Sequence, residues 1–394
     1  MKNVIIVFLA ILIASVPGLG EKKLTVKQLE DLLQSLQQQN RTDQEVANEL
    51  MQVELTEQLN RDTMNAMSGS LPGKQSTEQI YVLEAKSADM PPSASDIPTD
   101  PAPDATAQTS ILNKAFNYAA QTYKALPKLS ATATTLRFQD DVSAITSGGG
   151  LNSGAQDASV SSGLGGTIAY VHYINATEST LHFESGTEQP SPEKDKTLWG
   201  RNGMIALQAP TPSLPIAMAE AHASGHITFT RWQILFGRKL AVFSFSVDKK
   251  KSHDEVELCC FPEVTQTGIA NFYSPTLGAL NGMPGGGAKG NLQINAKWKQ
   301  YKSTVPYHGE FFVDPATGVI LRLITSADFK KSDYVHQLDQ RTDYSLVQVG
   351  GKALILPIKS IIQNEVVPQG DSGVGGHTNR HTYFVSEYKN YKTD

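Results

Sequence analysis

The chain has 394 residues, and its 34 Lys and Arg against 39 Asp and Glu give a formal net charge of −5. This balance argues against a nucleic-acid-binding protein, which normally carries a strong basic excess. Two cysteines are too few for the multiple disulfide bridges of a small secreted scaffold. The length allows two or three domains, each able to bury most of the surface that its unfolded chain exposes.

The N-terminal segment has the pattern of a secretory signal peptide. Lys2 precedes an apolar run over residues 4–16, and small residues stand at Gly18 and Gly20. The run is shorter than the roughly 20 residues that a membrane-spanning helix needs. We therefore predict a signal peptide over residues 1–20 and a secreted or periplasmic product with no transmembrane span after cleavage. The alternative is an uncleaved N-terminal anchor.

Residues 21–70 have the pattern of a helical region. Thr25 with Gln28, and Thr42 with Glu45, match the capping box that begins many helices. Apolar residues follow the first box at helical spacing, at Val26, Leu29, Leu33 and Leu36. Because isolated short helices are marginal in water, these helices are expected to pack on each other or on the rest of the protein.

Residues 71–127 are interpreted as a Pro-rich linker followed by one helix. The prolines stand among Ser, Asp and Ala, at Pro91, Pro92, Pro98, Pro101 and Pro103. This composition favours an extended segment with polyproline character. Apolar residues at helical spacing then predict a helix from about Ala107 to Tyr123.

Residues 128–394 change to an alternation with a period of two, which predicts strands. Tyr307–Val313 and Val319–Ile324 flank the turn sequence Asp314–Gly318, in which Pro and Gly favour a tight connection. Gly350-Gly351 separates a second pair of strands in the same way. Consecutive hairpins without intervening helices predict an antiparallel β-domain, and the fold class is therefore α+β.

Two sequence motifs suggest catalysis or nucleotide binding, and neither has the context that its chemistry needs. Gly370–Gly373 resembles the nucleophile segment of trypsin-like proteases, but it lies near the C-terminus without a protease-like histidine segment upstream. Gly285–Gly290 matches G-x-G-x-x-G, but it follows a proline and precedes a strand-like stretch. We assign no catalytic residue and no cofactor.

Two histidine pairs and one lysine-rich segment have spacings that occur in metal and nucleic-acid sites. His222 with His226, and His377 with His381, have the i, i+4 spacing of helical metal ligands, but neither pair has the glutamate of H-E-x-x-H. Lys297–Lys302 interleaves basic and aromatic residues, as single-strand binders do, and also fits an amphipathic strand. We predict no metal site and no nucleic-acid partner.

The adjacent cysteines Cys259 and Cys260 leave two interpretations open. A vicinal disulfide would act as a redox switch or stiffen a turn, since adjacent cysteines cannot close a large loop. Alternatively, they are two small apolar residues that point to opposite faces of a strand. The strand-like run Val256–Leu258 just before them favours the second interpretation.

Segments 24–26, 54–56, 240–260 and 307–323 together resemble a family of exported bacterial proteins that has no assigned function. Within them, the pattern Val313–Leu323 is also similar to outer-membrane lipoprotein-sorting and carrier proteins. That resemblance implies a curved, half-open β-barrel closed by helices, whose concave apolar face could hold a lipid or acyl chain.

These patterns support two hypotheses about function. The first is a non-catalytic exported protein that binds a lipid, an acylated protein or another apolar ligand on its curved sheet. The residues expected to line that site are aromatic: Phe229, Trp232, Phe243, Phe245, Phe311 and Tyr383. The alternative is that most of them form the core of the β-domain, because the sequence does not tell which face of the sheet is empty. The second is a structural or partner-binding envelope protein that docks through its N-terminal helices. The oligomeric state does not follow from these patterns.

Overall fold

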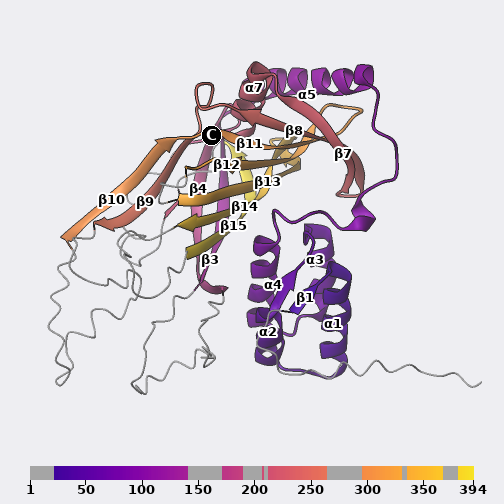
Figure 1. Cartoon of the computed structure of the whole chain (residues 1–394), viewed down its shortest axis with the longest axis vertical. Coiled ribbons are helices and arrows are strands. Elements are labelled where there is room, and N and C mark those ends of the chain that lie inside the picture. The colour runs from indigo at the N-terminus through magenta and orange to yellow at the C-terminus, as the bar shows by residue number, and fades with distance from the viewer. Residues whose placement is uncertain are drawn as a thin grey trace, which may run out of the picture.

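The computed structural model describes residues 22–140, 171–189, 206–207, 212–263, 295–330, 335–366 and 380–394. These residues form six α-helices and a ten-stranded antiparallel sheet, which confirms the predicted α+β class. The sheet is open, with β5 at one end and β7 at the other. Four helices form a separate layer beside it, and the other two cross the sheet near one end (Figure 1).

The N-terminal helical unit contains four helices and a two-stranded parallel sheet. Its elements are β1 (Lys22–Leu24), α1 (Val26–Gln38), α2 (Asp43–Met51), β2 (Val53–Leu55), α3 (Arg61–Met67) and α4 (Lys74–Lys86). Both predicted capping boxes are present, at Thr25 with Gln28 and at Thr42 with Glu45. The unit has its own apolar core, which includes Leu29, Leu33, Val46, Leu50 and Ile80.

Helix α4 lies in the segment that the sequence analysis assigned to the linker. Ile80 and Leu83 pack into the core of the helical unit, whereas Val82 and Ala85 pack against the large sheet. A helix that is buried on two sides lacks the single apolar stripe by which an amphipathic helix is recognised. The Pro-rich stretch begins only after α4 and contains one short turn, η2 (Ala94–Asp96).

The large sheet has the strand order β5-β4-β3-β15-β14-β13-β12-β11-β8-β7, and every neighbouring pair is antiparallel. Its strands are β3 (Leu129–Asp140), β4 (Val171–Glu184), β5 (Thr187–Glu188), β7 (Ile227–Leu235), β8 (Arg238–Val247), β11 (Tyr307–Val313), β12 (Ile320–Ala327), β13 (Val335–Val349), β14 (Lys352–Val366) and β15 (Arg380–Thr393). Both predicted hairpins, β11–β12 and β13–β14, are therefore confirmed. A smaller sheet contains β6 (Ala206–Leu207), β9 (Glu255–Glu263) and β10 (Asn295–Thr304).

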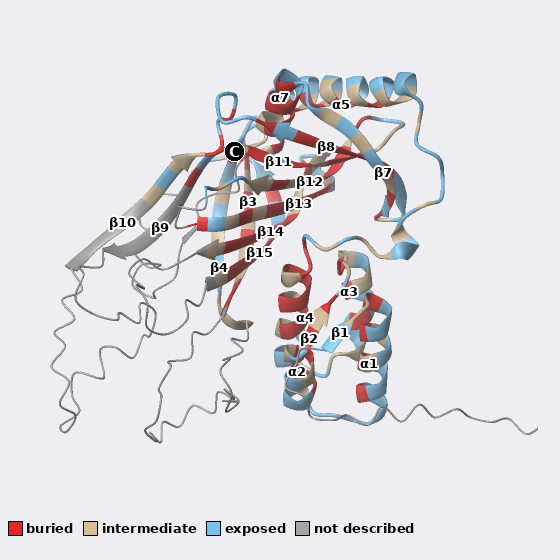
Figure 2. Ribbon diagram, in the orientation of Figure 1, coloured by how far each residue is buried: buried red, intermediate tan, exposed pale blue. Residues whose placement is uncertain are grey.

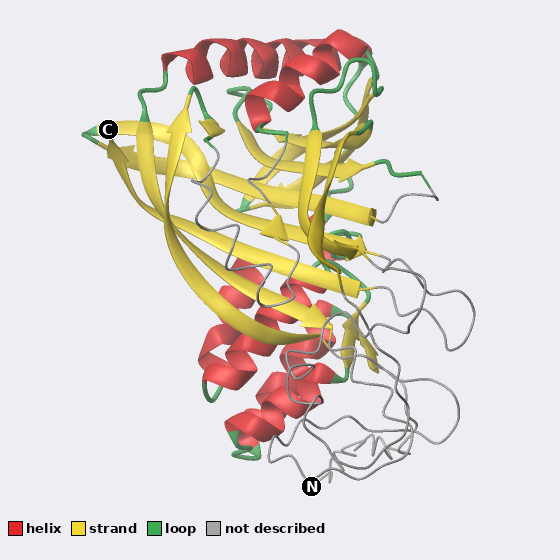
Figure 3. Cartoon of the chain, turned by 90° about the vertical axis from the view of Figure 1, so that its left-hand side faces the viewer, coloured by secondary structure: helices red, strands yellow, loops and turns green. Residues whose placement is uncertain are grey.

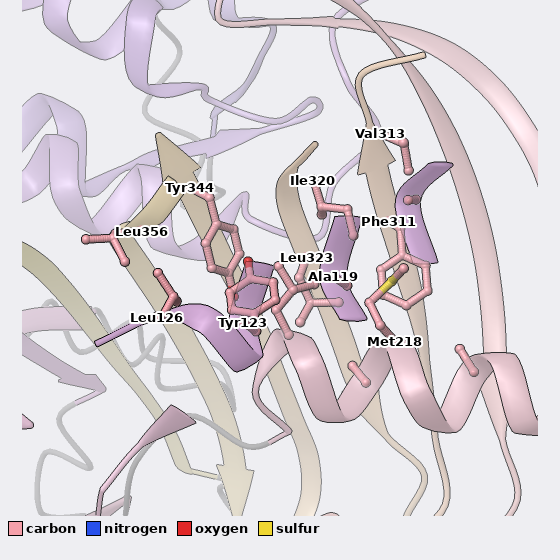
Figure 4. Close-up of a cluster of buried hydrophobic side chains, with 14 of the residues drawn as sticks. Ala119, Tyr123, Leu126, Met218, Phe311, Val313, Ile320, Leu323, Tyr344 and Leu356 are labelled. Carbon is pink, nitrogen blue, oxygen red and sulfur yellow. The ribbon is translucent and has the colours of Figure 1, made fainter. Parts of the chain in front are cut away.

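Helices α5 (Ala105–Ala125) and α7 (Leu214–Ser224) cover one face of the large sheet. Met218, Ala119 and Tyr123 pack there against strand residues such as Phe311 and Tyr344 (Figure 4). Helix α4 packs against the opposite face, so the sheet lies between two helical layers (Figure 3). Helices α5 and α7 are exposed on their outer sides, which face away from the sheet (Figure 2).

The β11–β12 turn is fixed to α5. The Asp314 carboxylate accepts hydrogen bonds from the backbone amides of Ala316 and Thr317, and Lys114 Nζ of α5 donates to the carbonyl of Pro315 at 3.1 Å. Gly318 has a φ of +78°, and a Cβ at this position would lie 2.5 Å from the carbonyl carbon of Lys114. Glycine is therefore required for both the backbone conformation and the close approach of the helix.

Substitution at this turn tests the contact. We expect Gly318→Ala to lower the free energy of unfolding by about 1–3 kcal/mol more than Gly350→Ala, since both positions have a positive φ but Gly350 faces open space. Urea unfolding of the two variants measures the difference. Equal losses would mean that α5 moves aside at no cost.

Candidate functional site

Five of the six aromatic residues expected to bind a ligand lie in one apolar cluster. Phe243, Phe245 and Phe311 are at most 3% exposed, and the Phe245 and Phe311 rings stack with centroids 4.2 Å apart. Phe229 and Trp232 are partly buried against the same cluster. The space above these rings is filled by α5 and α7, so their observed role is to form the core between the sheet and these helices.

The sixth aromatic residue, Tyr383, lies on the opposite face of the sheet. It packs with Phe138 and with Val82 and Ala85 of α4. The structure therefore does not bring the six residues into one site.

The face turned toward α4 carries polar side chains in rows that run across the strands. Residues opposite each other on neighbouring strands share a face and lie roughly 5 Å apart. One row contains Ser246, His308, Ser326 and Asp339, and a second contains Thr228, Ser244, Glu310, Ile324 and Arg341. A third contains Arg231, Val242, Phe312, Arg322, Asp343, Lys359 and Glu387. We call these the polar rows.

Where α4 covers the polar rows, their charges form a buried network. The Glu84 carboxylate of α4 accepts from Lys359 Nζ at 2.5 Å and from Arg341 Nη2 at 3.3 Å, and all three side chains are at most 1% exposed. Arg322 donates to both carboxylate oxygens of Asp343, at 2.5 and 3.0 Å. The Glu84 contacts join the helical unit to strands β13 and β14, and the Arg322–Asp343 pair joins β12 to β13.

Gln58 provides a second attachment of the helical unit. Its side-chain oxygen accepts from Arg322 Nη1 at 2.8 Å, and its Nε2 donates to the carbonyl of Ala88 at 2.5 Å. Its backbone amide donates to the carbonyl of Pro91 at 2.7 Å. One buried residue thus links the sheet to the segment that follows α4.

The buried network contains more cations than carboxylates. Three cations, Arg322, Arg341 and Lys359, face the carboxylates of Glu84 and Asp343. Burial alone would raise the pKa of Asp343, but Arg322 and Arg341 outweigh it and hold this pKa below its ordinary value.

Asp89 lies at the margin of this network, beside Asp339 and Arg341. Loss of surrounding water and the Asp339 carboxylate raise the pKa of Asp89, against the opposing effect of Arg341. Asp89 also accepts a hydrogen bond from Gln363 Nε2 at 2.9 Å, and it keeps a solvent-exposed side.

Beyond the end of α4 the polar rows are open, and they form the floor of a cleft of about 950 Å³. Strands β7, β8 and β11 supply the exposed hydrogen-bonding groups of Thr228, Ser246 and His308, and His226 lies just before β7. The opposite wall is the segment after α4, which supplies the apolar side chains of Met90, Pro91, Pro92 and Ile97. The cleft therefore combines a polar floor with an apolar wall.

An ion pair is fixed within the cleft. Arg231 Nη1 and Nη2 donate to the two oxygens of Glu310 at 2.6 and 2.8 Å, and Arg231 Nε donates to Gln233 at 3.0 Å. The guanidinium group also lies 5.7 Å from the centre of the Phe312 ring. Because these bonds use both edges of the guanidinium group, Arg231 shapes the floor and leaves little free positive charge for a ligand.

The histidine and cysteine predictions have different outcomes. His222 lies on α7, with its ring 4.5 Å from that of Phe116, but the helix ends at Gly225 and His226 lies beyond it in the cleft. The two residues therefore do not share a helix face. Cys259 and Cys260 lie in β9, but their side chains are outside the described part, so both interpretations stay open.

The other motifs of the sequence analysis are not placed in a site. Gly285–Gly290, Gly370–Gly373 and His377 lie outside the described residues, as do the side chains of 297–300. Across the described ranges, no group of three or more His, Cys, Asp or Glu side chains is arranged to hold a metal ion. None of the helices seen there is both long and apolar enough to cross a membrane.

Comparisons with known proteins found no matching family model, no matching curated protein and no matching solved structure. The site therefore has to be interpreted from its own geometry.

Removal of the central charge of the network tests its contribution to stability. We expect Glu84→Gln to lower the free energy of unfolding by about 3–5 kcal/mol, because it leaves Arg341 and Lys359 buried without their shared carboxylate. The matched control is Asp31→Asn in the exposed pair with Lys27, for which we expect a loss of about 0.5 kcal/mol. Chemical denaturation measures both, and similar losses would contradict the buried network.

The margin of the network predicts a dependence of stability on pH. The pKa of Asp89 is raised to about 8 in the folded protein, whereas the ordinary pKa of an aspartate is near 4. The contribution of this group to folding stability is therefore fully present below about pH 4 and is lost as the pH rises toward 8. We expect the Tm of the Asp89→Asn variant to decrease less than the Tm of the wild type between pH 5 and 8.5. Parallel Tm curves for the two proteins, measured by calorimetry, would contradict the shift.

Proposed function

We propose that this protein is an exported, non-catalytic binding protein that holds a partly apolar ligand in the cleft. The cleft itself carries the proposal, because its volume of about 950 Å³ lies within the range of ligand pockets and its walls offer both apolar surface and hydrogen-bonding groups. The pattern of residues 1–20 supports export. A lipid or an acylated protein segment is a ligand of this kind.

The charged groups of the cleft are paired, which supports a fixed surface for binding. Arg231 is held by Glu310 and Gln233, and His308 Nδ1 lies 3.0 Å from the Asp328 carboxylate. Side chains that are paired in this way present a fixed surface to a ligand. The packing of the helical unit on the sheet gives less support to the second function, in which the N-terminal helices dock a partner as a separate element.

A residue that fills the cleft tests the proposal. We expect Ser246→Trp to abolish ligand binding, because Ser246 is an exposed residue of the cleft floor, whereas Gln348→Trp on the exposed part of β13 leaves binding unchanged. The measurement is native mass spectrometry of the full chain, purified from the exported fraction of its cells, for a ligand that is released on denaturation. The same bound mass in all three proteins, or none in the wild type, would contradict the proposal.

A further inference from the structure

Strand β7 ends the large sheet, and its first half borders the cleft. Within the described residues, β8 is the strand that pairs with β7, and Gly225 to Thr228 line the cleft. An end strand presents a row of backbone N–H and C=O groups that can pair with another strand.

The direction of these groups follows from the pairing with β8. The carbonyl of His226 accepts a hydrogen bond from the Ser246 amide, and the carbonyl of Thr228 accepts from Ser244 Oγ at 3.4 Å. Because backbone groups alternate in direction along a strand, those of Ile227 and Phe229 point away from β8. None of the backbone bonds seen in the described turns and loops involves these two residues.

The regular pairing of β7 ends near the middle of the strand. The register with β8 shifts between Phe229 and Arg231, which interrupts the ladder. Beyond this point, Trp232 Nε1 donates to the Pro101 carbonyl at 2.9 Å, and Lys239 of β8 pairs with Asp100. Bulges are devices by which proteins interrupt exposed edges. Within the described residues, the uninterrupted part of this edge is therefore the part beside the cleft.

The wall opposite the polar rows adds a charge preference. Asp89, on the segment after α4, lines the cleft and is exposed. Arg231 is paired with Glu310 and Gln233. A cationic side chain placed beside Asp89 would stabilise the ionised form of this carboxyl group.

We propose that the ligand of the cleft is an extended peptide segment with a basic residue, which adds a strand to the open edge of β7 at Ile227 and Phe229. This inference rests on the proposed function and names its ligand class. The main chain of the peptide pairs with the two outward-facing residues. Alternate side chains enter the cleft beside Ile97, and the basic residue lies near Asp89.

Binding of backbone-modified peptides tests the geometry. The probe is a fluorescent hexapeptide, Lys-Val-Thr-Val-Lys-Val, blocked at both ends, with two versions that are N-methylated at odd or at even positions. Only one set of amides faces β7 in an added strand, so we expect one version to bind at least about tenfold more weakly and the other to bind like the parent peptide. Fluorescence anisotropy with the full chain measures all three.

Protein variants separate the edge from the charge. We expect Ile227→Pro, which removes an outward N–H, to weaken binding of the parent peptide about tenfold. We expect Asp89→Asn to weaken this binding severalfold, whereas the control Asp31→Asn leaves it unchanged. If Ile227→Pro fails to fold, hydrogen exchange of the wild-type protein replaces this variant. We then expect the peptide to slow exchange of the backbone amides of residues 227 and 229. Equal binding of both methylated versions, or no peptide binding, overturns the inference. If the peptide tests fail but a lipid or another molecule is bound by the wild type and lost in Ser246→Trp, the proposed function is still supported and only the ligand class is wrong.

Discussion

The carboxylate of Glu84, buried between Arg341 and Lys359, is the contact on which the arrangement of the molecule depends. Unpaired buried charges cost several kcal/mol, so α4 is stable on the sheet only where its carboxylate meets both cations. The position of α4 in turn determines where the following segment runs. Gln58 then holds that segment at Ala88 and Pro91, and the segment becomes the second wall of the cleft.

The two faces of the large sheet differ in how their side chains are satisfied. The face toward α5 and α7 is apolar and is filled by helix side chains such as Met218 and Tyr123. The opposite face carries the polar rows, which are buried in a charge network under α4 and open to solvent in the cleft. The polar rows thus stabilise the fold where α4 covers them and form a candidate binding surface where they are open in the cleft.

Much of the fold was predictable because its signals are local. Capping boxes at Thr25 and Thr42, and the hairpin turns at Asp314–Gly318 and Gly350-Gly351, depend on residues within a few positions of each other. Helix α4 was missed because it is buried on two sides and lacks a single apolar stripe. The aromatic residues were predicted to line a ligand site, but whether a face of the sheet is empty depends on helices that pack there from distant parts of the chain: α5 and α7 cover five of them, and α4 packs beside Tyr383.

The sequence by itself determined the class of fold, the strand periodicity and the position of several turns, since each of these follows from local backbone preference and side-chain alternation. Tertiary structure alone decided the candidate site. Arg231 and Glu310 lie 79 positions apart, and Gln58 and Arg322 lie 264 apart, so no local spacing brings them together. Their meeting follows from the strand order and from the burial of Glu84, because a charge that leaves water must find its partners wherever the chain has placed them.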